Sequence, residues 1–206
     1  MNKLLFILVG IYFLCLLSAG EGMSQWKKGD ENKCPASGPY INSWYGFQIE
    51  IPTGMTGCPN SPVFMSDHGV LIPLVPAKTR WIECYAGYNG PLYSTVEEAV
   101  DSTIDWLKEN ARPESLEIKS RLYLLLDGIK AERVLIQYTD KESGVVIIKD
   151  TIELLRSIIK ENAAPSHQYS LSLFTTPDHY ASDHVLFEQV IKSWRKAKSE
   201  DESPNQ

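Results

Sequence analysis

Histidine and cysteine are the residues of this chain whose types could support covalent chemistry. His68 lies in Ser-Asp-His-Gly at 66–69, between Cys58 and Cys84 in the sequence. A histidine beside a cysteine can take the thiol proton and create a thiolate nucleophile. The sequence therefore leaves open a small hydrolase or thiol enzyme that uses His68 with Cys58 or Cys84. The alternative interpretation is a loop histidine before a turn glycine.

No motif in the sequence specifies a reaction. It contains no G-x-S-x-G, no phosphate-binding loop and no dinucleotide fingerprint. His179 and His184 each follow an aspartate near the start of an expected helix, but helical metal pairs are spaced i, i+4. We interpret both as surface histidines. No catalytic residue, metal site or cofactor is predicted, and an enzyme is the less favoured hypothesis.

A tyrosine-rich segment indicates binding instead. Residues 85–91 read Tyr-Ala-Gly-Tyr-Asn-Gly-Pro, and Tyr93 follows. Tyrosine provides a large contact area at low entropic cost and is enriched among the residues that dominate binding energy. Tyr88 and Tyr93 fall in a predicted loop and should be partly exposed. We therefore predict that Tyr85, Tyr88 and Tyr93 contact a protein partner, with ordinary sheet packing as the alternative.

The composition is that of an ordinary folded protein. The chain has 206 residues, of which 43% are hydrophobic and 22% charged. This apolar content is enough to bury a core, so disorder over most of the length is excluded. The formal net charge of −6 argues against a nucleic-acid partner, which would require a basic surface. An acidic immunity or inhibitor protein with a basic partner is a further alternative.

Residues 1–20 have the three parts of a secretory signal peptide. Lys3 supplies the positive charge, residues 4–17 are almost wholly apolar, and Ser-Ala-Gly follows at 18–20. The apolar run is shorter than the roughly 20 residues needed to span a bilayer. We predict a periplasmic or secreted protein without a stable membrane anchor after cleavage. An uncleaved leader that anchors the chain is the alternative.

Removal of this leader leaves three cysteines, Cys34, Cys58 and Cys84. An odd number allows at most one disulfide within the chain, and an oxidising compartment favours its formation. Cys34 and Cys58 both lie beside proline in loop-like sequence, whereas Cys84 lies in a strand-like run. We favour a Cys34–Cys58 disulfide, although spacing does not fix connectivity.

The remaining patterns predict a single α+β domain at 44–198, between an irregular arm at 21–43 and a disordered acidic tail at 199–206. Asp127-Gly128 indicates a two-residue hairpin turn within an antiparallel meander at 116–175. The expected architecture is an antiparallel sheet with helices packed on it, resembling a sandwich. Strands are predicted at 47–51, 70–75, 79–85, 116–126, 129–139, 145–155 and 169–173, and helices at 95–109 and 183–198.

Three segments together have a familiar order: Tyr-Gly-Phe-Gln-Ile-Glu-Ile-Pro-Thr-Gly at 45–54, Leu-Asp-Gly-Ile-Lys-Ala-Glu-Arg-Val at 126–134, and Phe-Glu-Gln-Val-Ile-Lys-Ser-Trp at 187–194. Across residues 45–195 the chain resembles the PsbP/Mog1-like α/β/α sandwich family, apart from residues 58–89. The resemblance implies that fold and a non-catalytic interaction or accessory role. It carries over no catalytic residue. We therefore expect a secreted or periplasmic interaction domain with an unspecified ligand.

Overall fold

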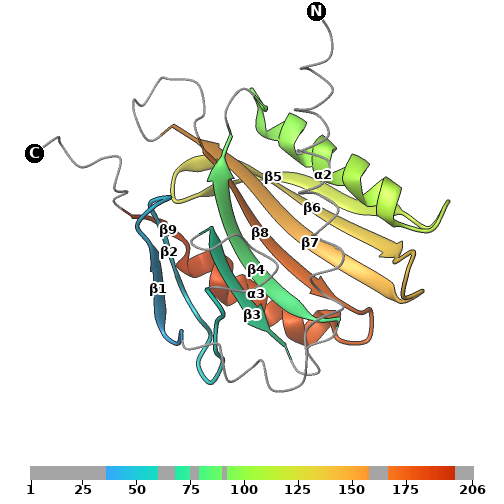
Figure 1. The fold of residues 1–206 in the computed structure, drawn as a ribbon, viewed down its shortest axis with the longest axis horizontal. Coiled ribbons are helices and arrows are strands. Elements are labelled where there is room, and N and C mark those ends of the chain that lie inside the picture. The colour runs from blue at the N-terminus through green and yellow to red at the C-terminus, as the bar shows by residue number, and fades with distance from the viewer. Residues whose placement is uncertain (1–35, 60–67, 75–78, 90–91, 158–166, 198–206) are drawn as a thin grey trace, which may run out of the picture.

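The computed structural model describes residues 36–59, 68–74, 79–89, 92–157 and 167–197. These residues form two antiparallel sheets and two helices (Figure 1). The predicted leader, the acidic tail and Cys34 lie outside the described residues, so the predictions made for them remain predictions. Within the described part, no helix is both long and apolar enough to cross a membrane.

A six-stranded antiparallel sheet forms the centre of the fold, in the order β3-β4-β8-β7-β6-β5. Strands β5 to β8 are consecutive in the sequence and form the meander predicted for residues 116–175. β4 comes from earlier in the chain and pairs with β8. The bounds are β3 (Gly69–Pro73), β4 (Trp81–Tyr88), β5 (Glu117–Leu126), β6 (Ile129–Thr139), β7 (Val146–Arg156) and β8 (His167–Thr175).

A smaller sheet has the order β1-β2-β9, with β1 (Pro39–Asn42), β2 (Phe47–Glu50) and β9 (Arg195–Lys196). Phe47 and Ile49 of β2 alternate with polar residues as predicted, and each is 1% exposed. β1 lies in the segment that we expected to be an irregular arm. Its backbone pairs with β2, a long-range partner that the sequence of the arm does not indicate.

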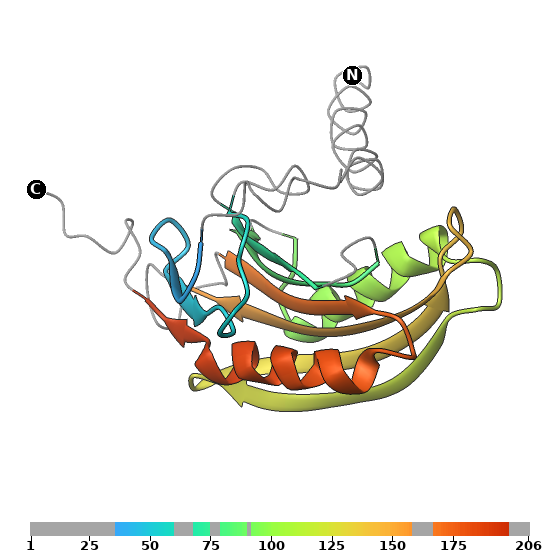
Figure 2. The ribbon, with the colours of Figure 1, turned by 90° about the horizontal axis from the view of Figure 1, so that it is seen from below.

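Helices α2 (Val96–Asn110) and α3 (Tyr180–Ser193) cover opposite faces of the six-stranded sheet (Figures 1 and 2). The buried stripe of α2 is the predicted one, and it includes Val100, Ile104 and Leu107. Phe187 and Val190 of α3 enter the larger core with β2 and the sheet. The predicted α+β sandwich is therefore confirmed.

Both helices begin at residues that we did not predict. α2 begins at Val96, one residue after the expected start, because Thr95 is its N-cap: the Thr95 hydroxyl accepts from the Glu98 amide at 3.3 Å. α3 begins at Tyr180, before the expected Asp183, whose carboxylate bonds to other side chains instead of to helix amides. The helix also ends before the expected residue 198, since the chain after Ser193 extends to pair with β2 as β9.

The predicted turn at Asp127-Gly128 is confirmed. Leu126 pairs with Ile129, and the two turn residues have φ angles of 47° and 80°. Both positive angles are those of a type I′ turn, whose twist matches that of the flanking strands. Asp127 also accepts a hydrogen bond from the Lys196 amide at 2.9 Å, which ties the turn to β9.

Replacing Gly128 with valine should destabilise the fold, because a β-branched side chain resists a positive φ. We expect Gly128→Val to lower the free energy of unfolding by about 1–2 kcal/mol in urea denaturation. Gly128→Asn is the matched control and should cost less, since asparagine tolerates this region. Equal unfolding midpoints for the two variants would contradict the turn assignment.

Candidate functional site

Two of the predicted binding tyrosines gather with two histidines and a third tyrosine at one end of the β4–β8 pair. We name Tyr45, His68, Tyr85, Tyr88 and His167 the β4 aromatic cluster. Tyr88 lies opposite His167 in the strand register, with ring centroids 4.8 Å apart. The Tyr45 ring lies 5.5 Å from each of these two rings. His68 stacks on Tyr85 with centroids 5.3 Å apart and an interplanar angle of 17°.

Tyr88 is the exposed member of this cluster. Its side chain is 60% exposed, whereas Tyr45 is 5% and His167 2% exposed. Buried rings therefore support Tyr88 from below while its outer surface remains in water. A side chain held in this way loses little further conformational freedom when a partner binds, which favours a contact role.

His68 is fixed by hydrogen bonds on both ring nitrogens. Its Nδ1 lies 2.9 Å from the carbonyl oxygen of Ala86, which can only accept, so Nδ1 carries the proton. The Tyr45 hydroxyl lies 3.2 Å from Nε2 and 3.3 Å from Nδ1. These contacts hold the imidazole in place among the aromatic rings around it.

The structure gives the thiol-enzyme alternative no suitable nucleophile. Cys84 is a free thiol that is 1% exposed, and burial raises its pKa far above the ordinary value, with the Glu83 carboxylate adding to the rise. Cys58 is disulfide-bonded. Because Cys34 lies outside the described residues, the Cys34–Cys58 pairing stays a prediction. The hydrogen-bond and ring partners of His68 within the described residues are Tyr45, Tyr85 and Ala86.

Tyr93 lies apart from the cluster but is held by the residue that follows Tyr88. The Asn89 side chain donates to the Tyr93 carbonyl at 2.7 Å and accepts from its amide at 3.3 Å. The half-buried Tyr93 ring extends to α2, where its hydroxyl donates to Ser102 at 2.9 Å. The predicted tyrosines therefore lie along one braced segment, although only Tyr85 and Tyr88 belong to the cluster.

A buried polar network on the α2 face was not predicted from the sequence. Glu153 is 2% exposed and accepts hydrogen bonds from Ser170, Gln168 and Thr103 of α2. Burial raises the pKa of Glu153, and the nearby Lys149 ammonium opposes this rise. The pKa of Glu83 is raised for the same reason. The alternating serines of β8 were the available signal, since they face polar neighbours across the sheet.

The two histidines of the Asp-His pairs near α3 are both partly exposed, whereas one of the aspartates is buried. Asp183 is 1% exposed and forms a bidentate ion pair with Arg80, at 2.5 and 2.8 Å. His184 is partly exposed and lies 3.3 Å from Asp150, a buried carboxylate that Arg133 also contacts. Among the described residues, no group of His, Cys, Asp or Glu is arranged to hold a metal ion.

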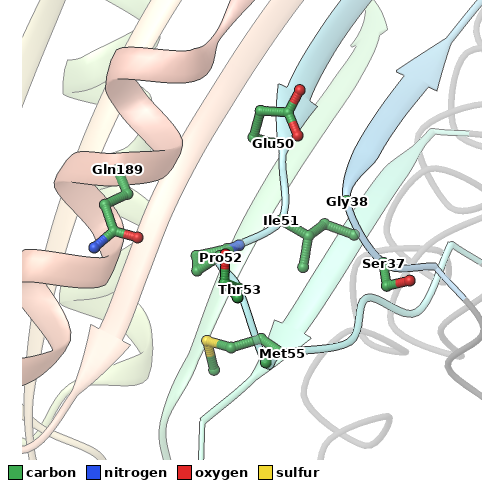
Figure 3. A pocket seen from close by; sticks show the side chains of 9 residues that line it. Ser37, Gly38, Glu50, Ile51, Pro52, Thr53, Met55 and Gln189 are labelled. Carbon is green, nitrogen blue, oxygen red and sulfur yellow. The ribbon is translucent and has the colours of Figure 1, made fainter.

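A second candidate is a hollow of about 470 Å³ beside the end of β2 (Figure 3). Ile51, Pro52 and Met55 give it apolar walls, and Gln189 of α3 lies across from them. The exposed Glu50 carboxylate lies at its rim. Its volume is in the range of small-molecule pockets, but it contains few convergent polar groups.

Comparison with known proteins shows the fold alone. No protein-family model matches the chain, and no curated protein matches its sequence. LpqN of Mycobacterium tuberculosis, described as involved in cell envelope biogenesis, is 10% identical over 77% of this chain and 89% of its own, with a TM-score of 0.51. The cyanobacterial PsbP (CyanoP) of Synechocystis sp. PCC 6803 is 14% identical over 77% of this chain and 91% of its own, with a TM-score of 0.49. The α+β sandwich expected from the sequence is confirmed as a fold, and LpqN shares it.

The buried Glu153 carboxyl predicts a specific pH dependence of stability. Its pKa is raised in the folded protein, so its contribution to stability is complete below the unfolded pKa of about 4.3 and is lost as pH rises through the folded pKa. Glu153→Gln lacks this titration. As pH rises from about 4 to 8, the free energy of unfolding of the wild type should therefore fall relative to that of Glu153→Gln.

Urea denaturation at several pH values measures this difference. Glu109→Gln, on the exposed face of α2, is the matched control and should show little change with pH. A difference for Glu153→Gln that stays constant or moves the other way would contradict the raised pKa.

Proposed function

We propose that this chain is a non-catalytic, extracytoplasmic interaction domain that binds a protein partner through the surface of Tyr85, Tyr88 and Tyr93. The single observation that supports this most is the 60% exposure of Tyr88 above the buried rings of Tyr45 and His167. A rigid aromatic side chain offers contact area whose ordering cost has largely been met in the free protein.

The rest of the tyrosine surface supports the same role. His68 stacking fixes the half-buried Tyr85 ring, and Asn89 fixes the backbone at Tyr93. Leu92, next to Tyr93, is 56% exposed and adds apolar area. Exposed aromatic and aliphatic groups that are braced from behind form the kind of patch in which binding energy concentrates.

The extracytoplasmic location is supported by the leader pattern at 1–20 and by the disulfide state of Cys58, because disulfides persist in oxidising compartments. LpqN, which shares the fold, is described as involved in cell envelope biogenesis. A role in which the domain assists other proteins outside the cytoplasm agrees with these features.

A photo-crosslinking amino acid at position 88 tests the proposal in the native host. We expect p-benzoylphenylalanine at 88 to give one dominant protein adduct, because the side chain points outward from a braced site. The same residue at position 185, where Val185 of α3 is 57% exposed, is the matched control and should not give that adduct. The absence of any adduct specific to position 88 would contradict the proposal.

Truncation separates binding from folding. Tyr88→Ala should reduce recovery of the crosslinked partner at least tenfold while changing the free energy of unfolding by less than about 1 kcal/mol. Tyr88→Phe should retain most binding, since the ring supplies the contact area. If the protein turns over a substrate and His68→Ala abolishes that turnover, the result would instead favour the thiol-enzyme or hydrolase alternative.

A further inference from the structure

β5 is an outer strand of the six-stranded sheet, at the far side from β4. Its burial pattern is exposed at each of the first seven positions, from Glu117 to Tyr123. Within the described residues, no strand pairs with its outer edge. In Figure 2 this strand lies along the lower margin of the molecule. An edge of this kind presents unpaired backbone N–H and C=O groups, which another strand can satisfy.

The opposite edge of the same sheet is closed. β3 has five residues and ends in Pro73, which has no N–H to donate. Leu71 of β3 also exchanges backbone hydrogen bonds with Cys58, at 2.8 and 3.3 Å. The chain therefore covers one outer edge of its main sheet and leaves the other open.

The open edge is protected along only half of its length. The first half of β5 contains a bulge between Ile118 and Ser120 and the charged residues Glu117, Lys119 and Arg121. Bulges and charges of this kind are the features that discourage edge pairing. Residues 122–125 have neither, and the exposed fractions are 46% for Leu122, 57% for Tyr123 and 71% for Leu125.

The hairpin geometry shows which backbone groups face outward. Leu126 and Ile129 flank a two-residue turn, so they exchange backbone hydrogen bonds with each other. Because this pattern alternates along an antiparallel pair, Leu124 and Leu122 also bond to β6. The N–H and C=O groups of Arg121, Tyr123 and Leu125 therefore point away from the sheet.

We propose that a second copy of this chain binds at this edge, β5 against β5 in antiparallel orientation, with Tyr123 on the two-fold axis. In this register Tyr123 lies opposite its own copy, and Arg121 lies opposite Leu125. All three outward-facing residues of each strand then exchange backbone hydrogen bonds. A register centred on Arg121 would instead set two guanidinium groups directly opposite each other, which is unfavourable.

The apolar side chains fit the same register. Leu122 of one copy lies opposite Leu124 of the other, on the face that α3 covers. Leu124 already packs against the main core, so these contacts continue that core across the axis. The two-fold arrangement brings the same strand from each copy together, as an isologous interface requires. This inference is independent of the tyrosine surface, which lies at β4, near the opposite edge of the sheet.

Sedimentation velocity tests the proposal on the protein purified after any processing by the cell. The protein concentration is varied over roughly 1–100 μM at about 0.15 M salt. We expect a monomer–dimer equilibrium. Tyr123→Lys and Tyr123→Glu should each raise the dissociation constant at least tenfold, because two like charges then face each other across the axis. An equimolar mixture of the two variants should restore dimers, which shows that both variants remain folded.

Ile41→Lys is the matched control, since Ile41 is 60% exposed on the short edge strand β1 and should not affect dimerisation. If either Tyr123 variant unfolds, Leu125→Pro provides a second test, because it removes an outward N–H without breaking the ladder to β6. The proposal is overturned if the protein is monomeric throughout, if the variants dimerise like the wild type, or if mixing restores nothing. A monomer that captures a different protein through a crosslinker at position 125 also overturns it.

Discussion

The pairing of β4 with β8 is the interaction on which the rest of the structure depends. The two strands come from different halves of the chain and pair continuously from Trp81↔Phe174 to Tyr88↔His167. Without this pairing, the β3–β4 hairpin and the β5–β8 meander would be separate sheets with additional open edges. Closing so long a loop costs chain entropy, which burial of residues such as Ile82 and Leu171 offsets.

The same register aligns side chains into rows across the sheet. Glu83 lies opposite Ser172, which lies opposite Thr151, and Tyr85 lies opposite Ser170 in the neighbouring row. Residues that are opposite one another point to the same face, so polar residues on β8 gather polar neighbours on both sides. α2 covers these rows. Its Thr103 hydroxyl is one of the groups that donate to the buried Glu153 carboxylate beneath the helix.

Local patterns predicted the parts of the fold that depend on few neighbouring residues. Asp127-Gly128 specifies its turn because the positive φ angles belong to those two positions, and the apolar stripe of α2 belongs to a single helix. The β4 aromatic cluster is different, because Tyr45 and His68 are 23 residues apart. Their meeting depends on the pairing of distant strands, which no pattern within either segment records.

Asp183 shows the same limit for an ion pair. In the sequence it resembles an acidic residue that favours a helix N-terminus, but its partner Arg80 lies 103 residues earlier. The residue type of Asp183 and its position along the chain predict an interaction with the helix N-terminus. Its burial and the Arg80 guanidinium beside it decide the role that it actually has. Thr175, which also donates to this carboxylate at 2.5 Å, comes from the end of β8.

These charged groups fix how α3 lies on the sheet. Arg80 binds Asp183 in the first turn of the helix, and Arg133 bridges Asp150 of the sheet to Glu188 one turn later, at 2.7 Å to each. Buried ion pairs add little net stability compared with apolar packing, but breaking one costs about 3–5 kcal/mol, because it leaves an unpaired charge. Rotation of α3 would break both pairs at once. We infer that the ion pairs select the one orientation in which Phe187 enters the core, while apolar burial supplies most of the stability.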